Sequence, residues 1–127
     1  MAQAVLDASA VLALLAGEKG SEQVEQLLGS VLISAVNLAE VLAKLGDRGV
    51  SVEEQRQIRQ GLDVEVRGFD ELSAWTSAGL RSATRTHGLS IGDRACLALA
   101  VQESLPVLTT DRQWSKLDLG IEIRVLR

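Results

Sequence analysis

Short apolar runs alternate with helical segments along the chain, and this alternation limits the possible folds more than any other feature. The runs lie at residues 4–6, 31–33, 64–66, 106–108 and 121–126. Strands separated by helices form parallel sheets, with right-handed crossovers that place helices on both faces. We therefore expect one α/β domain over residues 1–127, built on a short-stranded parallel sheet flanked by helices on both faces.

The segments between these runs have helical spacing and end at residues that commonly cap helices. The expected helices are 11–16, 21–28, 35–45, 55–62, 70–86 and 95–101, and residues 114–119 are short and either helical or irregular. Gly17, Gly29 and Gly88 each follow such a segment, as is typical of helix C-termini. Ser34 stands where an N-cap is expected, directly after an apolar run.

Four acidic side chains stand where an expected strand ends or beside a strongly apolar helix face. Asp7 directly follows the first run, and Asp111 follows the fourth after two threonines. Glu40 lies beside the apolar stripe of its helix, and Asp93 opens the most aliphatic helix. In open parallel sheets, ligands bind beyond the carboxyl ends of the strands. We therefore expect these four acids to lie at one edge of the sheet.

Each acid also has an ordinary structural interpretation, which is the better one when each is taken alone. Asp7 and Asp111 would cap the following turns, Glu40 would pair with Lys44, and Asp93 would complement a helix dipole. Taken together, the four acids favour a shared site. Carboxylates gathered without a cation repel one another and raise their own pKa values, a conflict that a divalent cation removes.

Oxygen ligands without histidine or cysteine favour Mg²⁺ or Mn²⁺ over zinc. A water molecule on such a metal has a lowered pKa and is a nucleophile for attack on a phosphodiester. Five further residues are candidates for supporting the ligands or contacting phosphate: Ser9, Asn37, Thr110, Arg94 and Arg112.

Composition excludes some classes of function and leaves a metal-dependent nuclease open. The net charge of −4 and the aromatic content of 2% disfavour a plain DNA-binding module and a base-stacking platform. The single cysteine, Cys96, permits neither a disulfide framework nor a thiolate zinc site. The N-terminal run lacks a basic region before it, and no run is long enough to span a membrane, so we expect a cytoplasmic protein.

Four sequence motifs resemble those of a known family. They are VLDASA at residues 5–10, NLAEV at 37–41, SIGDRACLALA at 90–100 and LTTDRQW at 108–114. These segments resemble the motifs of PIN-domain proteins, and their order, spacing and chain length resemble the VapC toxins of bacterial type II toxin–antitoxin systems. The resemblance covers essentially the whole chain, and the motif around Asp93 is its most specific part.

The resemblance implies that Asp7, Glu40, Asp93 and Asp111 form the acidic site of a Mg²⁺- or Mn²⁺-dependent endoribonuclease, with Asp7 and Asp93 as the first choices for direct ligands. It further implies a homodimer, an RNA substrate, often tRNA or rRNA, and inhibition by a cognate VapB-like antitoxin. Two other interpretations remain open at this point. One is a receiver-like phosphoacceptor signalling domain. Such domains usually have a lysine after a late strand, where this sequence has Thr-Thr-Asp at residues 109–111. The other is a catalytically silent RNA- or protein-binding module with the same fold.

Overall fold

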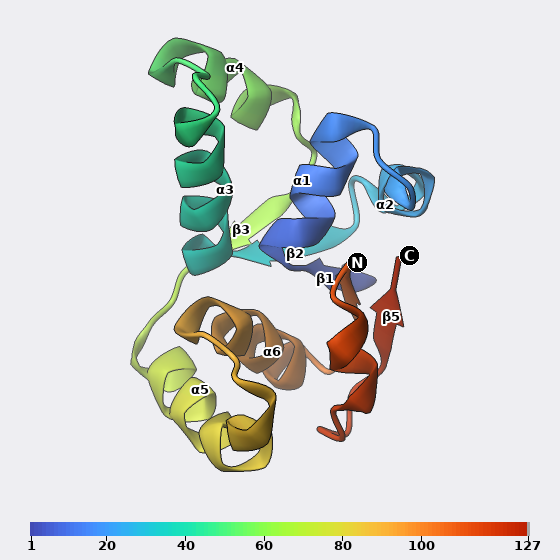
Figure 1. Ribbon diagram of the computed structural model, residues 1–127, viewed down its shortest axis with the longest axis vertical. Coiled ribbons are helices and arrows are strands. Elements are labelled where there is room, and N and C mark those ends of the chain that lie inside the picture. Colours follow the sequence, from blue (N-terminus) through green and yellow to red (C-terminus); the bar gives the residue numbers. More distant parts are fainter. Residues whose placement is uncertain (127) are drawn as a thin grey trace.

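Five parallel strands form one sheet in the computed structural model of the protein, which describes residues 1–126 (Figure 1). The strands are β1 (Ala4–Leu6), β2 (Val31–Ser34), β3 (Glu65–Arg67), β4 (Val107–Thr109) and β5 (Ile123–Val125). Their order across the sheet is β3-β2-β1-β4-β5, and every neighbouring pair is parallel. The parallel sheet expected from the sequence is confirmed, although its last strand is shorter than residues 121–126.

Six α-helices and two short 3-10 helices connect the strands. They are α1 (Ala8–Ala16), α2 (Ser21–Leu27), α3 (Ala35–Asp47), α4 (Val52–Gly61), α5 (Glu71–Thr84), η1 (Arg85–His87), α6 (Ile91–Glu103) and η2 (Arg112–Lys116). Helix α1 begins earlier than expected because the Asp7 side chain caps its first turn. Helix α6 likewise begins early, at a capping box formed by Ser90 and Asp93. Within residues 1–126 no helix is both long and apolar enough to cross a membrane.

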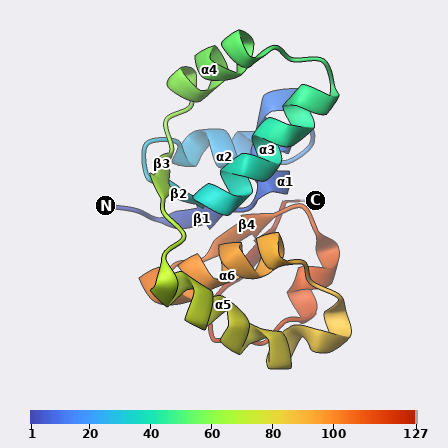
Figure 2. The same ribbon diagram turned by 90° about the vertical axis from the view of Figure 1, so that its left-hand side faces the viewer.

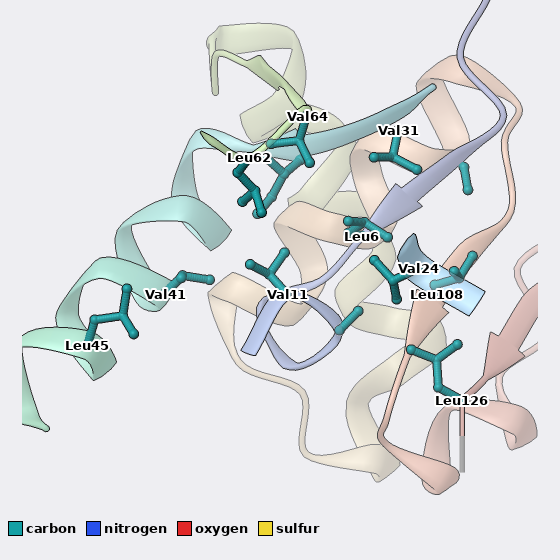
Figure 3. Packing of buried hydrophobic residues seen from close by; sticks show 13 residues of the cluster. Leu6, Val11, Val24, Val31, Val41, Leu45, Leu62, Val64, Leu108 and Leu126 are labelled. Carbon is teal, nitrogen blue, oxygen red and sulfur yellow. The ribbon is translucent and has the colours of Figure 1, made fainter. Parts of the chain in front are cut away.

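The two faces of the sheet are covered by different helices, as expected for this class of fold. Helices α1 to α4 lie on one side and α5 and α6 on the other (Figure 2). Side chains of β1 alternate between the two sides, so Leu6 joins one buried cluster and Val5 the other. The first cluster, shown in Figure 3, also contains Val11, Ile33 and Leu108.

The strand order creates a crevice beside the central strand. The chain runs outward from β1 through β2 to β3, and then returns so that β4 pairs with the opposite side of β1. The connections that follow β1 and β4 therefore lead to opposite faces of the sheet, which opens a crevice at the carboxyl ends of these two strands. Asp7 follows β1, and Asp111 stands two residues after β4.

Candidate active site

A cleft of about 240 Å³ lies at the carboxyl edge of the sheet. It is lined by Asp7, Ala8, Ser9, Leu12, Asn37, Glu40, Lys44, Asp93, Asp111 and Trp114. All four acids expected to share a site line this cleft. They come from the segment after β1, from α3, from α6 and from the segment after β4.

Asp7 is the most enclosed of the four acids, with only 6% of its surface exposed. Its Oδ1 accepts hydrogen bonds from the backbone N–H of Ala10 at 2.8 Å and from the Ser9 hydroxyl at 2.7 Å. Its Oδ2 accepts a hydrogen bond from the Thr109 hydroxyl at 2.6 Å. Asp7 therefore caps α1, as its ordinary interpretation predicts, and is also held in a fixed orientation at the wall of the cleft.

Ser9 and Thr109 join the ends of β1 and β4 around Asp7. The Ser9 hydroxyl accepts a hydrogen bond from the backbone N–H of Thr110 at 2.9 Å. The Thr109 hydroxyl accepts one from the backbone N–H of Asp111 at 3.1 Å. Both hydroxyls thus donate to the carboxylate and accept from the segment after β4, so one network fixes Asp7 relative to Asp111.

Glu40 is held by the amide of Asn37, three residues before it on α3. The Asn37 Nδ2 donates to Glu40 Oε1 at 2.8 Å and to the backbone carbonyl of Gly92 at 3.0 Å. Asn37 is almost fully buried, and its Oδ1 has no hydrogen-bond partner within residues 1–126. Its side chain therefore orients Glu40 and ties α3 to the first turn of α6.

The remaining two acids accept hydrogen bonds from nearby backbone N–H groups. Asp93 Oδ2 accepts from the N–H of Ser90 at 3.0 Å, and Asp111 Oδ1 accepts from the N–H of Gln113 at 2.9 Å. The capping interpretation of Asp111 is therefore correct as a local description, and Asp93 does stand in the first turn of its helix, as the helix-dipole interpretation requires. The expected ion pair of Glu40 with Lys44 is absent from the salt bridges formed within residues 1–126.

The carboxylates make the cleft electrostatically unfavourable for a negative charge. Burial raises the pKa of Asp7, hydrogen bonds from Thr109, Ser9 and Ala10 oppose that rise, and the negative charge of Asp93 adds to it. Burial also raises the pKa of the Cys96 thiol well above its usual range, and the charges of Asp7, Asp93 and Glu40 add to that effect. The negative charges of Asp7, Asp93 and Glu40 therefore all act on the buried thiol of Cys96.

Comparison with known proteins assigns the family. The model of the PIN-domain family matches residues 4–119. The chain belongs to the PIN-domain family. The receiver-like interpretation is accordingly not favoured, since the match includes all four segments that line the cleft.

Several solved structures share the fold of this PIN domain. A chain of the DNA-bound VapBC complex of Salmonella typhimurium has a TM-score of 0.74 and 19% identity, over 100% of both chains. VapBC-5 of Mycobacterium tuberculosis has a TM-score of 0.61 and 26% identity, over 100% of this chain and 99% of that one. Mycobacterium tuberculosis VapC20, a toxin that cleaves the sarcin–ricin loop, has a TM-score of 0.69 and 18% identity, over 94% and 99% of the two chains. No curated protein matches the sequence.

The side chains of the cleft fit a hard divalent cation in their donor chemistry. The cleft offers carboxylate and hydroxyl oxygens, a donor set that suits Mg²⁺ or Mn²⁺. Within residues 1–126, no three acidic, histidine or cysteine side chains already form a group that could hold a metal ion. The hydrogen bonds of Glu40, Asp93 and Asp111 keep these carboxylates on their own helices and turns.

Three residues that the sequence suggested for the site lie outside the lining of this cleft. They are Thr110, Arg94 and Arg112. Thr110 contributes its backbone N–H to Ser9, while the hydroxyl that contacts Asp7 belongs to the preceding threonine. The two arginines stay predicted phosphate contacts that the geometry of the cleft does not test.

Two polar residues that line or support the cleft were missed from the sequence. Thr109 is one of two adjacent threonines that follow an apolar run, and the sequence alone does not fix which of the two faces Asp7. Lys44 lies one helical turn after Glu40, and the sequence suggested only an ion pair between them. Lys44 is among the residues that line the acidic cleft, and it makes no salt bridge within residues 1–126.

Proposed function

We propose that this PIN domain is a VapC-type endoribonuclease that hydrolyses RNA phosphodiester bonds with the help of Mg²⁺ or Mn²⁺. The observation that carries the proposal is the convergence of four carboxylates from four separate segments on one cleft. Solved structures with the same fold include VapC20, which cleaves the sarcin–ricin loop, and this favours structured RNA as the substrate class.

The residues have distinct roles in this proposal. Asp7 and Asp93 would hold a divalent cation, with Glu40 and Asp111 completing the acidic site. A cation held there would supply a water molecule of lowered pKa for attack on the scissile phosphate. Ser9 and Thr109 keep both oxygens of Asp7 in fixed orientations, so little reorganisation of this carboxylate is needed when substrate binds.

The proposed activity is tested with purified protein that is free of any antitoxin. Structured RNA such as tRNA or rRNA is expected to be cut with Mg²⁺ or Mn²⁺ and to stay intact in excess chelator. Asp93→Asn should abolish cutting while the fold persists, and Asp47→Asn, on the exposed end of α3, should leave it unchanged. Cleavage that persists in chelator or in Asp93→Asn would contradict the proposed site.

The partners that follow from a VapC-type function are a VapB-like antitoxin and a second copy of the chain. Solved structures with this fold include several toxin–antitoxin complexes, which supports an antitoxin partner. We propose that the protein acts in the cytoplasm as a homodimer and is inhibited there by its antitoxin. Expression alone is then expected to arrest growth, and co-expression of a small neighbouring gene should relieve the arrest. Normal growth with a demonstrably active nuclease would contradict the toxin role.

Lys44 is the basic side chain through which we propose that the cleft contacts RNA phosphate. Lys44→Met is expected to raise KM several-fold with a smaller effect on kcat. The plot of log(kcat/KM) against log salt concentration should become less steep by about 0.7–1, because one phosphate contact is lost. Lys116→Met is the matched control, because Lys116 is exposed on η2 and lies outside the lining of the cleft. An equal effect of the two substitutions would contradict the contact.

A further inference from the structure

The carboxylate of Glu40 occupies the space that a side chain at Gly92 would need. A methyl group built on Gly92 would lie 2.5 Å from Glu40 Oε2, 2.6 Å from Oε1 and 2.7 Å from Cδ. These distances are far shorter than the approach of about 3.5–4.0 Å that is favourable between non-bonded heavy atoms. Gly92 is buried in the first turn of α6, directly before Asp93. The missing side chain therefore makes room for an acid of the cleft.

Gly92 is not required by the conformation of the backbone. It lies within α6 and lacks the positive φ found at Gly17 and Gly88. Alanine is a better helix former than glycine, so local helix propensity favours a side chain at this position. The three atoms nearest to an added methyl group all belong to the Glu40 carboxylate, so a side chain at this position would meet that carboxylate first.

The same carboxylate is also held by a hydrogen bond from Asn37. Asn37 donates to Glu40 Oε1 and to the backbone carbonyl of Gly92, so one amide links the carboxylate to the glycine. Gly92 lies in the first turn of α6, where the helix dipole favours the negative charge of the nearby Glu40 carboxylate. Glu40 is thus held between the amide of Asn37 and the bare backbone of Gly92.

We propose that Gly92 is a positioning residue of the acidic site, which acts by leaving the space where the Glu40 carboxylate sits beside Asp93. This inference rests on the proposed metal-dependent function of the cleft. A methyl group at this position would push the carboxylate away from its place while leaving the fold intact, because the displaced atoms are the end of a flexible side chain. Gly92 therefore controls the metal site without contacting metal or substrate.

The test compares Gly92→Ala with Gly79→Ala. Gly79 lies within α5, and a methyl group built there meets nothing within 4 Å, so both substitutions gain the same helix propensity and only the first displaces Glu40. Mn²⁺ affinity is measured from the rise in melting temperature with Mn²⁺ concentration, and kcat and KM are measured on RNA. Gly92→Ala is expected to weaken Mn²⁺ binding and to lower kcat by about 10- to 100-fold, whereas Gly79→Ala leaves both unchanged.

A double-substitution cycle shows whether Gly92 acts through Glu40. In a Glu40→Ala background the added methyl group has nothing to displace, so Gly92→Ala should then leave Mn²⁺ affinity unchanged. In chelator, Gly92→Ala should raise the melting temperature less than Gly79→Ala does, and the two gains should become equal once Glu40 is alanine.

Wild-type Mn²⁺ affinity in Gly92→Ala, or an equal loss with and without the Glu40 side chain, would overturn the positioning role. If the wild-type protein shows no rise in melting temperature with Mn²⁺, the metal site of the proposed function fails. The melting temperatures of the same variants in chelator would then still decide whether Gly92 positions Glu40, because that measurement needs no metal.

Discussion

Asp7→Asn is expected to abolish RNA cleavage and, at the same time, to raise the melting temperature of the metal-free protein. The loss of activity should be about 100-fold or more, since the substitution removes a charged ligand from the proposed metal site. The stability gain arises because burial and the nearby charge of Asp93 disfavour the ionised form of Asp7. Asparagine keeps an acceptor for Ala10, and the Thr109 hydroxyl can rotate to accept from its amide.

The stability gain of Asp7→Asn should depend on pH. The pKa of Asp7 is raised on folding, so the folded state holds a proton more readily than the unfolded state, and the stability of the wild type decreases as pH rises through the folded pKa. Thermal unfolding in chelator should therefore show a larger gain at pH 7 than near the ordinary pKa of 3.8, where folded Asp7 is protonated more often than it is at pH 7.

Two further variants separate the effect of charge from the effect of capping. Asp7→Ala removes the N-cap of α1 and leaves the Thr109 hydroxyl without its acceptor, so it should lose about 1 kcal/mol or more. Asp118→Asn, at an exposed position outside the cleft, should change neither activity nor stability. If Asp7→Asn melted at a lower temperature than the wild type at pH 7, this would contradict the claim that burial disfavours the ionised form of Asp7.

Trp114→Ala is expected to produce the largest loss of stability. The indole is 1% exposed and packs with Val5, Leu97 and Val107 under one face of the sheet, while it also forms a wall of the cleft. Truncating a buried tryptophan costs about 3–5 kcal/mol, a large part of the 5–15 kcal/mol that stabilises a typical domain. Thermal unfolding followed by circular dichroism should show a midpoint lower by on the order of 10–20 °C.

Trp114→Phe is the control for this prediction. Phenylalanine retains one aromatic ring in the cluster, and it removes an indole N–H that has no acceptor within residues 1–126. Removing an unsatisfied buried donor offsets part of the loss of packing. The loss of stability should therefore be clearly smaller than for alanine. Equal losses for the two variants would show that the ring packing of Trp114 contributes little.

The order of strands and helices could be predicted because burial leaves a periodic pattern in the sequence. Val5 and Leu6 point to opposite clusters and both are fully buried, so a short continuous apolar run is sufficient to indicate a central strand. The placement of Asp7 and Asp111 followed from the rule that ligands bind beyond the carboxyl ends of parallel strands. Both acids do line the cleft found at that edge.

The supporting residues were harder to predict because they depend on how separate elements meet. A shift of one residue along a strand reverses the direction of a side chain, so the choice between Thr109 and Thr110 needs the register of β4. Adjacent residues on a helix do not share a face, and Arg94 accordingly lies outside the cleft that Asp93 lines. The contact of Glu40 with Gly92 depends on the packing of α3 against α6, which no local pattern specifies.

The central claim is that the carboxylates of the cleft bind the metal that supports RNA hydrolysis. Anomalous scattering from crystals of the wild-type protein grown with Mn²⁺ tests it most directly. We expect an anomalous peak inside the cleft, within coordination distance of Asp7 and Asp93, with the carboxylate of Asp93 turned away from the N–H of Ser90. A peak elsewhere on the protein, or an empty cleft at saturating Mn²⁺, would contradict it.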